Sequence, residues 1–136
     1  MSPSSGGVTV VVVRAWALRE VIGGSNPYVV VDWGPCGKHS TQAVMDSTEP
    51  YFGSVLKFKS PFQATHRPAM AVMKVYVYSR NLSTSDELLG YVELNSEGLL
   101  ALLGGSSECA TMTYQLVDLL DKQNPHAGCI QLTGSL

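Results

Sequence analysis

Apolar and polar positions alternate along much of the chain with the two-residue period of β-strands. Segment 70–78 shows this most clearly, because its alternate positions form one wholly apolar set and one mixed set. The apolar set is Met73, Val75 and Val77, and the mixed set is Val72, Lys74, Tyr76 and Tyr78. Successive side chains of a strand point to opposite faces of its sheet, so this segment is predicted to bury one face and expose the other.

Turn-forming residues separate this segment from other runs rich in β-branched and aromatic residues, for example at Gly23–Gly24 and at Asn124–Pro125. Strands are therefore predicted at 8–15, 27–33, 39–45, 54–59, 70–78, 88–94, 111–118 and 127–133. One short helix is predicted at 97–103, with Ser96 as its N-cap and Gly104 as its C-terminal stop. This order of elements indicates an all-β fold, a sandwich or a barrel.

Length and composition fit one globular unit. The 136 residues are enough to bury a substantial core, and 45% of them are hydrophobic while only 15% are charged. Residues 1–7 are rich in serine and glycine and are predicted to be a flexible lead-in or an expression remnant. A single domain is predicted at 8–136.

Charge and cysteine content narrow the range of functions. Nine basic and eleven acidic residues give a formal charge of −2, without the basic cluster that attracts nucleic acid. The widely spaced Cys36, Cys109 and Cys129 form no zinc or disulfide pattern, which favours a reducing, cytoplasmic setting. The apolar run from Val8 is interrupted by Arg14 and is too short to span a bilayer.

Catalytic motifs are missing from the sequence. It has no GxSxG, no HExxH and no phosphate-binding loop. A Cys–His nucleophile pair stays open, but nothing in the pattern marks Cys36 or His39 as activated. The chain is therefore predicted to be non-catalytic, with no cofactor and no small-molecule substrate.

Four short motifs follow one another in an order typical of one family of β-sandwich modules. They are Ser25–Val29, Ser47–Phe52, Val77–Asn81 with Glu87–Gly90, and Gly128–Leu132. Together they resemble the C2 domain, whose Ser-Asp-Pro-Tyr-Val signature reads Ser-Asn-Pro-Tyr-Val here. The resemblance implies an eight-stranded antiparallel Greek-key sandwich. A chain that starts on the Val8 strand and ends on the Ile130 strand is similar to the family's permuted, type II topology.

The resemblance also implies where a calcium site would lie. In calcium-binding C2 domains, acidic side chains from three loops surround the ions, because Ca²⁺ needs several charged oxygen ligands. The matching positions here are Glu20, Asn26, Ser79, Asn81 and Glu87, with Asp86 adjacent to the last. Asn26, Ser79 and Asn81 are neutral, so micromolar calcium binding is predicted to be lost, and Asn26 is interpreted as a turn residue. A weak, nonstandard site of Glu20, Asp86 and Glu87 is the alternative.

Membrane binding by the loop tips is a second candidate activity. Val21, Ile22 and Leu82 would insert as apolar anchors, or else pack within their own loops. The three loops also carry two arginines and five carboxylates, and this negative charge opposes binding to anionic lipids.

The family's phosphoinositide-binding strand corresponds to residues 38–44. This stretch holds one lysine, Lys38, and one histidine, and Lys57 and Lys59 alternate on the next strand. Compared with a true polybasic cluster this basic surface is thin, and the sequence favours a solvated sheet face.

A protein-binding surface is the function that the sequence favours. Val10–Val13 make the first strand apolar on both faces, and Tyr76 and Tyr78 lie opposite the core-facing residues of their strand. Such side chains would form a patch suited to a protein partner, although a covering loop would explain them as well. The sequence thus predicts a calcium-independent C2 module that docks a protein within a larger cytoplasmic, cytoskeletal or ciliary scaffold. Peripheral membrane targeting through phospholipid or phosphoinositide is the alternative.

Overall fold

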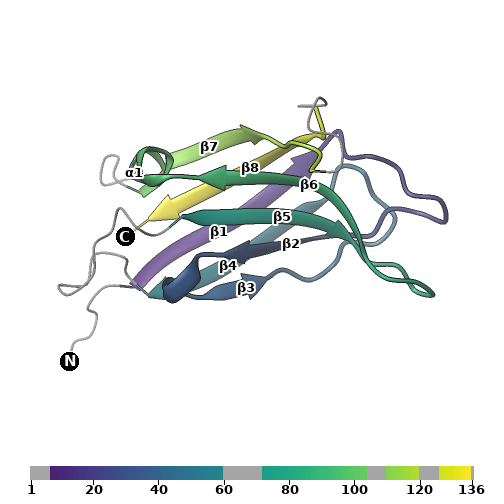
Figure 1. The fold of residues 1–136 in the computed structure, drawn as a ribbon, viewed down its shortest axis with the longest axis horizontal. Helices are drawn as coiled ribbons and strands as arrows, with labels where there is room; N and C mark the ends of the chain where they lie inside the picture. The colour runs from purple at the N-terminus through teal and green to yellow at the C-terminus, as the bar shows by residue number, and fades with distance from the viewer. Residues whose placement is uncertain (1–6, 60–71, 104–109, 120–125, 136) are drawn as a thin grey trace.

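Two four-stranded antiparallel sheets form the protein (Figure 1), as a computed structural model shows for residues 7–59, 72–103, 110–119 and 126–135. One sheet has the order β4-β1-β8-β7, made of β4 (Tyr51–Lys59), β1 (Gly7–Trp16), β8 (Cys129–Ser135) and β7 (Ala110–Gln115). The other has the order β3-β2-β5-β6, made of β3 (Lys38–Ser40), β2 (Pro27–Asp32), β5 (Met73–Ser79) and β6 (Glu87–Leu94). The predicted eight-stranded all-β sandwich is confirmed.

The core lies between the two sheets and consists of the inward-facing alternate positions of the strands. On β5 the predicted alternation is confirmed, with Met73, Val75 and Val77 at 0% exposure. Val10 and Val12 of β1 are equally buried, whereas Val11 and Val13 on the other face are half-buried. Each large aliphatic side chain contributes about 1.5–3 kcal/mol when it is fully buried, so this layer is the main source of stability.

The predicted strand at 39–45 ends at Ser40 because a side chain interrupts its ladder. Val29 N donates to the Thr41 hydroxyl at 3.0 Å instead of to a backbone carbonyl. The chain still follows β2, since Thr41 N donates to Val29 O and Val44 N donates to Pro27 O, both at 2.9 Å. A threonine that replaces a backbone acceptor looks like an ordinary strand residue in the sequence, which is why the pattern predicted too long a strand.

The predicted strand at 111–118 ends at Gln115 because the chain crosses to the other sheet. Val117 pairs with Tyr91 of β6, with backbone hydrogen bonds of 2.8 and 3.0 Å. The start of the last strand also differs from the prediction. Gly128 has a φ of +112° and precedes β8, which therefore begins at Cys129 rather than at residue 127.

The predicted helix at 97–103 is present as α1 (Ser96–Leu103), but its N-cap is one residue earlier than expected. Asn95 Oδ1 accepts a hydrogen bond from Gly98 N at 3.0 Å, which is the N-cap geometry, so Ser96 is the first helical residue. A single 3₁₀ turn, η1 (Gly34–Cys36), links β2 to β3. The predicted stop at Gly104, residues 1–6 of the predicted lead-in and Cys109 lie outside the described residues.

Candidate functional site

Three loops meet at one end of the sandwich, where the β1–β2 and β5–β6 connections extend beyond the sheets on the right of Figure 1. They are residues 17–26 after β1, 41–50 after β3 and 80–86 after β5. The first two are joined by a backbone hydrogen bond of 2.8 Å from Ser47 N to Ser25 O. These are the loops that the sequence assigned to calcium and membrane binding.

Asn26 joins all three loops. Its Oδ1 accepts a hydrogen bond from Asp46 N at 2.8 Å, and its Nδ2 donates to Arg80 O at 2.9 Å. Its backbone N donates to Ser79 Oγ, and its backbone O accepts from Arg80 N, both at 2.9 Å. Asn26 and Ser79 are buried, with 8% and 0% exposure. Because a carboxylate has no N–H, the bond to Arg80 O requires an amide at position 26.

Asn81 and Asp86 hold the β5–β6 loop in shape. Asn81 Nδ2 donates to Ser85 O at 2.7 Å, and Asn81 N donates to Asp86 Oδ1 at 3.1 Å. The other oxygen of Asp86 accepts from the Tyr28 hydroxyl at 2.5 Å. These two donors lower the pKa of Asp86 below its usual range, the Tyr28 bond having the larger effect. Burial and the same bond raise the pKa of Tyr28 to about 12.

Glu87 and Glu20 have different surroundings. Glu87 forms an ion pair with Arg19, whose guanidinium also donates to Leu88 O at 3.3 Å and so links the β1–β2 loop to β6. Glu20 is exposed in the β1–β2 loop. Among the described residues, no three His, Cys, Asp or Glu side chains lie close enough together to hold a metal ion.

The loop tips carry exposed apolar side chains, with one difference from the prediction. Ile22 and Leu82 are almost fully exposed, at 103% and 83%. Both line a hollow of about 560 Å³ between the β1–β2 and β5–β6 loops. Val21, in contrast, is only 7% exposed and belongs to the core, which agrees with the packing alternative and not with insertion at the tip. Met45 of the β3–β4 loop is 54% exposed and was not predicted, because an isolated methionine in a loop has no periodic signal.

The outward face of the β3-β2-β5-β6 sheet carries a tyrosine cluster, which we define as Tyr28, Tyr76, Tyr78 and Tyr91. Ring centroids are 5.6 Å apart for Tyr28–Tyr78, 6.0 Å for Tyr76–Tyr78 and 5.0 Å for Tyr76–Tyr91. All four are half-buried, and strand register brings them together, since Tyr28 pairs with Tyr78 and Tyr76 with Tyr91. The sequence identified only the two tyrosines of β5, because it does not reveal which strands are neighbours.

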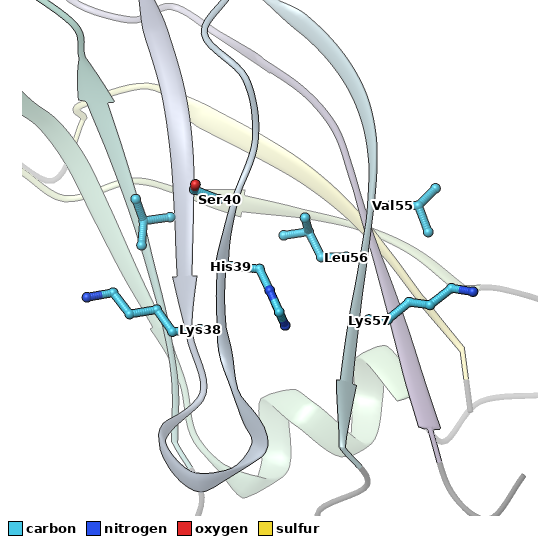
Figure 2. A pocket seen from close by; sticks show the side chains of 7 residues that line it. Lys38, His39, Ser40, Val55, Leu56 and Lys57 are labelled. Atoms are coloured by element: carbon cyan, nitrogen blue, oxygen red, sulfur yellow. The ribbon is translucent and has the colours of Figure 1, made fainter. Parts of the chain in front are cut away.

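Lys38 and Lys57 lie on opposite sides of a groove of about 820 Å³ between β3 and β4. Figure 2 shows His39 between the two strands, with the two lysines on either side of it. The His39 ring packs against Phe58 with centroids 4.9 Å apart. Lys59 is exposed on β4 but does not line this groove. The lysines of the predicted basic surface thus belong to different sheets, Lys38 to β3 and Lys57 and Lys59 to β4.

Two antiparallel four-stranded sheets, with three loops gathered at one end, define the class of β-sandwich module that the sequence motifs suggested. The C2 domain family model matches residues 6–113, and the chain belongs to this family. No curated protein matches the chain significantly. The described residues contain no helix with the length and apolarity needed to cross a membrane.

Three solved structures illustrate the similarity. A C2 domain of plant Extended Synaptotagmin 1 has a TM-score of 0.76 and 24% identity, over 96% of this chain and 92% of that one. A structure of CC2D1B, described as coordinating ESCRT-III activity in nuclear envelope reformation, gives 0.71 and 23%, over 95% of this chain and 54% of that one. Human GIVD cytosolic phospholipase A2 gives 0.70 and 17%, over 95% of this chain but only 16% of the enzyme. At these identities the likeness establishes the fold.

Proposed function

We propose that this C2 domain is a non-catalytic, calcium-independent module that docks a protein partner through the tyrosine cluster, within a larger cytoplasmic protein. The observation that carries the proposal is the gathering of four half-buried tyrosine rings on one sheet face. Tyrosine is enriched at protein interfaces because it offers a large contact area with few rotatable bonds.

The tyrosine cluster is already ordered for binding. The Tyr28 hydroxyl donates to Asp86 and the Tyr91 hydroxyl donates to Glu93, so two of the four rings are fixed at their outer ends. Rings held in place lose little further freedom when a partner binds, which lowers the entropic cost of association. The paired carboxylates also place negative charge beside the rings, and this favours a protein over an anionic lipid surface.

Calcium independence is supported by the bonds at the aligned ligand positions. The Asn26 amide is occupied by Asp46 N and Arg80 O, and Glu87 is paired with Arg19. The non-catalytic part of the proposal is supported at Cys36, where burial raises the pKa of the thiol and disfavours a thiolate nucleophile. The permuted type II topology is supported by the pairing of β1 with both β4 and the last strand, β8.

The experiment compares proteins retained from a cytoplasmic extract by the wild type, by Tyr76→Ser with Tyr78→Ser, and by Tyr51→Ser as a matched control. Tyr51 is 69% exposed on the other sheet. In the presence of a calcium chelator, the wild type and the control are expected to retain a protein that the double variant does not retain. Once purified, this protein is expected to bind the wild-type domain directly. Direct binding that requires micromolar calcium, or that survives the double variant, would overturn the proposal. Circular dichroism verifies that each variant is folded.

Peripheral membrane binding is a second candidate, favoured by the exposure of Ile22, Met45 and Leu82 on three neighbouring loops. Apolar side chains at such tips contribute about 0.8 kcal/mol for each buried CH₂ group. Sedimentation with phosphatidylcholine vesicles, with and without phosphatidylserine, tests it. If Ile22→Asp with Leu82→Asp leaves sedimentation unchanged, the tips are not the membrane contact.

A further inference from the structure

β3 and β4 are the terminal strands of the two sheets, and they lie beside each other along one side of the sandwich. In the described part of the chain, β4 pairs with β1 alone and β3 pairs with β2 alone. Among the described residues, each strand therefore has one edge without ladder partners. Such an edge presents backbone N–H and C=O groups that can accept a further strand.

A groove runs between these two edges. Its main part has a volume of about 820 Å³, and an adjoining hollow of about 390 Å³ shares Ser40, Val55 and Leu56 as lining residues. On the β4 side the lining extends from Phe52 to Lys57. Six strand residues span roughly 20 Å, which is the length of an extended peptide of about six residues.

The charges at the two sides of the groove are of one sign, and the Lys38 and Lys57 side chains extend away from each other in Figure 2. Lys38 and Lys57 line its main part, and the residues that line the two hollows include no aspartate or glutamate. Val55 and Val30 supply apolar surface next to the lysines. On β4, Val55 and Lys57 point away from the core while Leu56 points into it, so a strand added here would meet Lys57 together with Val55 on its outer face and Leu56 on its inner face.

We infer that the groove between β3 and β4 binds an extended acidic peptide segment of a protein partner, which adds as a strand to the free edge of β4. Backbone hydrogen bonds between the peptide and β4 supply affinity that does not depend on the peptide's sequence. Lys38 and Lys57 select acidic segments because they attract the peptide's carboxylates. This interaction goes beyond the proposed docking at the tyrosine cluster and does not depend on it, because it uses other residues.

An extended peptide fits this groove better than a phosphoinositide headgroup. A compact polyphosphate needs several cations that converge on one point, whereas Lys38 and Lys57 belong to different sheets on opposite sides of the groove. The elongated lining of Phe52, Val55 and Leu56 offers a headgroup nothing to bind. Inositol lipid vesicles are therefore an opposing arm of the test.

The probe is a fluorescein-labelled peptide of nine residues in which glutamates alternate with valines, measured by fluorescence anisotropy. A peptide with lysines in place of the glutamates is expected to bind at least about tenfold more weakly. Two further versions carry N-methyl groups on either the odd or the even amides. At least one of them must lose binding, because N-methylation removes donors that strand pairing needs and leaves the side chains unchanged.

Variants of the protein locate the site. Lys38→Glu with Lys57→Glu is expected to weaken binding about tenfold, whereas Lys74→Glu, an exposed lysine two strands away from β3, leaves it unchanged. The bound peptide should also slow hydrogen exchange in 51–59. The inference is overturned if both N-methyl series bind like the parent, or if no peptide binds. It is likewise overturned if phosphatidylinositol bisphosphate vesicles, rather than the peptide, depend on Lys38 and Lys57.

Discussion

The side-chain amide of Asn26 donates a hydrogen bond of 2.9 Å to the backbone carbonyl of Arg80, across 54 positions in the sequence. The bond links the β1–β2 loop to the β5–β6 loop. A position that the family resemblance aligns with a calcium ligand thus carries an amide whose two ends bond two neighbouring loops.

Replacing the amide by a carboxylate should destabilise the protein. In Asn26→Asp the donor to Arg80 O is lost and a charge is buried beside that carbonyl, so we expect a loss of about 1–3 kcal/mol in the free energy of unfolding. Urea denaturation at pH 7 measures it. Asn95→Asp is the matched control, because Asn95 caps α1 with its oxygen, and we expect no significant change there. An unchanged stability in Asn26→Asp would contradict the role assigned to the amide.

The pKa of Asp86 should depend on the Tyr28 hydroxyl. Tyr28→Phe removes the donor with the largest effect on this carboxyl, so we expect the pKa of Asp86 to rise toward its usual value. Titration of the carboxyl carbon by NMR measures the change. Tyr78→Phe removes a neighbouring hydroxyl and should leave the titration nearly unchanged.

The same bond predicts a pH dependence of stability. Because the folded protein lowers the pKa of Asp86, the Tyr28–Asp86 bond stabilises the folded state above about pH 4, the usual range of an aspartate. This contribution is lost as the pH falls through the lowered pKa. The stability difference between wild type and Tyr28→Phe should therefore shrink from pH 6 to pH 2, and a difference that grows would contradict the assignment.

Gly128 should tolerate no side chain. A Cβ at this position would lie 2.8 Å from Trp16 O and 3.0 Å from Ala17 O, and its φ of +112° is unfavourable for alanine. We expect Gly128→Ala to cost about 3 kcal/mol, since both the backbone strain and the clash must be accommodated. Gly23→Ala is the matched control, because φ is +92° there but nothing lies within 4 Å of the added carbon. It should cost only about 1 kcal/mol, and equal costs would show that the clash is relieved.

Adjacent residues at the loop tip should respond differently to the same change. Val21→Asp places a carboxylate in the core and should cost about 3 kcal/mol or more. Ile22→Asp changes a fully exposed side chain and should stay within about 0.5 kcal/mol of the wild type. Thermal unfolding of the two variants measures the contrast, and a similar loss in both would place Ile22 in a packed environment.

The regular alternation of apolar and polar residues predicted the fold. The features that this alternation did not predict depend on single side chains. The alternation of Met73, Val75 and Val77 identified the core face of β5 from the sequence alone. The end of β3 depends on the hydroxyl of Thr41, and Val21 is buried because Ser25 Oγ accepts from its backbone N at 2.8 Å and turns the loop inward. Such bonds between specific atoms leave no periodic signal.

Sites built from several strands were predicted only in part, for a related reason. Tyr76 and Tyr78 share one strand and were identified together, but Tyr28 and Tyr91 join them only through the register of β2 and β6 with β5. Lys38 and Lys57 were predicted as members of one surface, and both line a groove that exists because β3 and β4 end different sheets. The sequence identifies surface residues that share one strand more readily than the residues of neighbouring strands that lie beside them.

The two tryptophans of the chain make it a spectroscopic reporter of its own core. Trp33 is fully buried and meets Phe58 of β4 edge-on, with ring centroids 5.5 Å apart, and its indole N–H has no acceptor among the described residues. Trp16 is half-buried, with the guanidinium of Arg14 4.9 Å from its ring. Trp33 should therefore emit at shorter wavelength than Trp16. In a Trp16→Phe variant, the shift of the remaining emission to the red would register separation of the two sheets without any added dye.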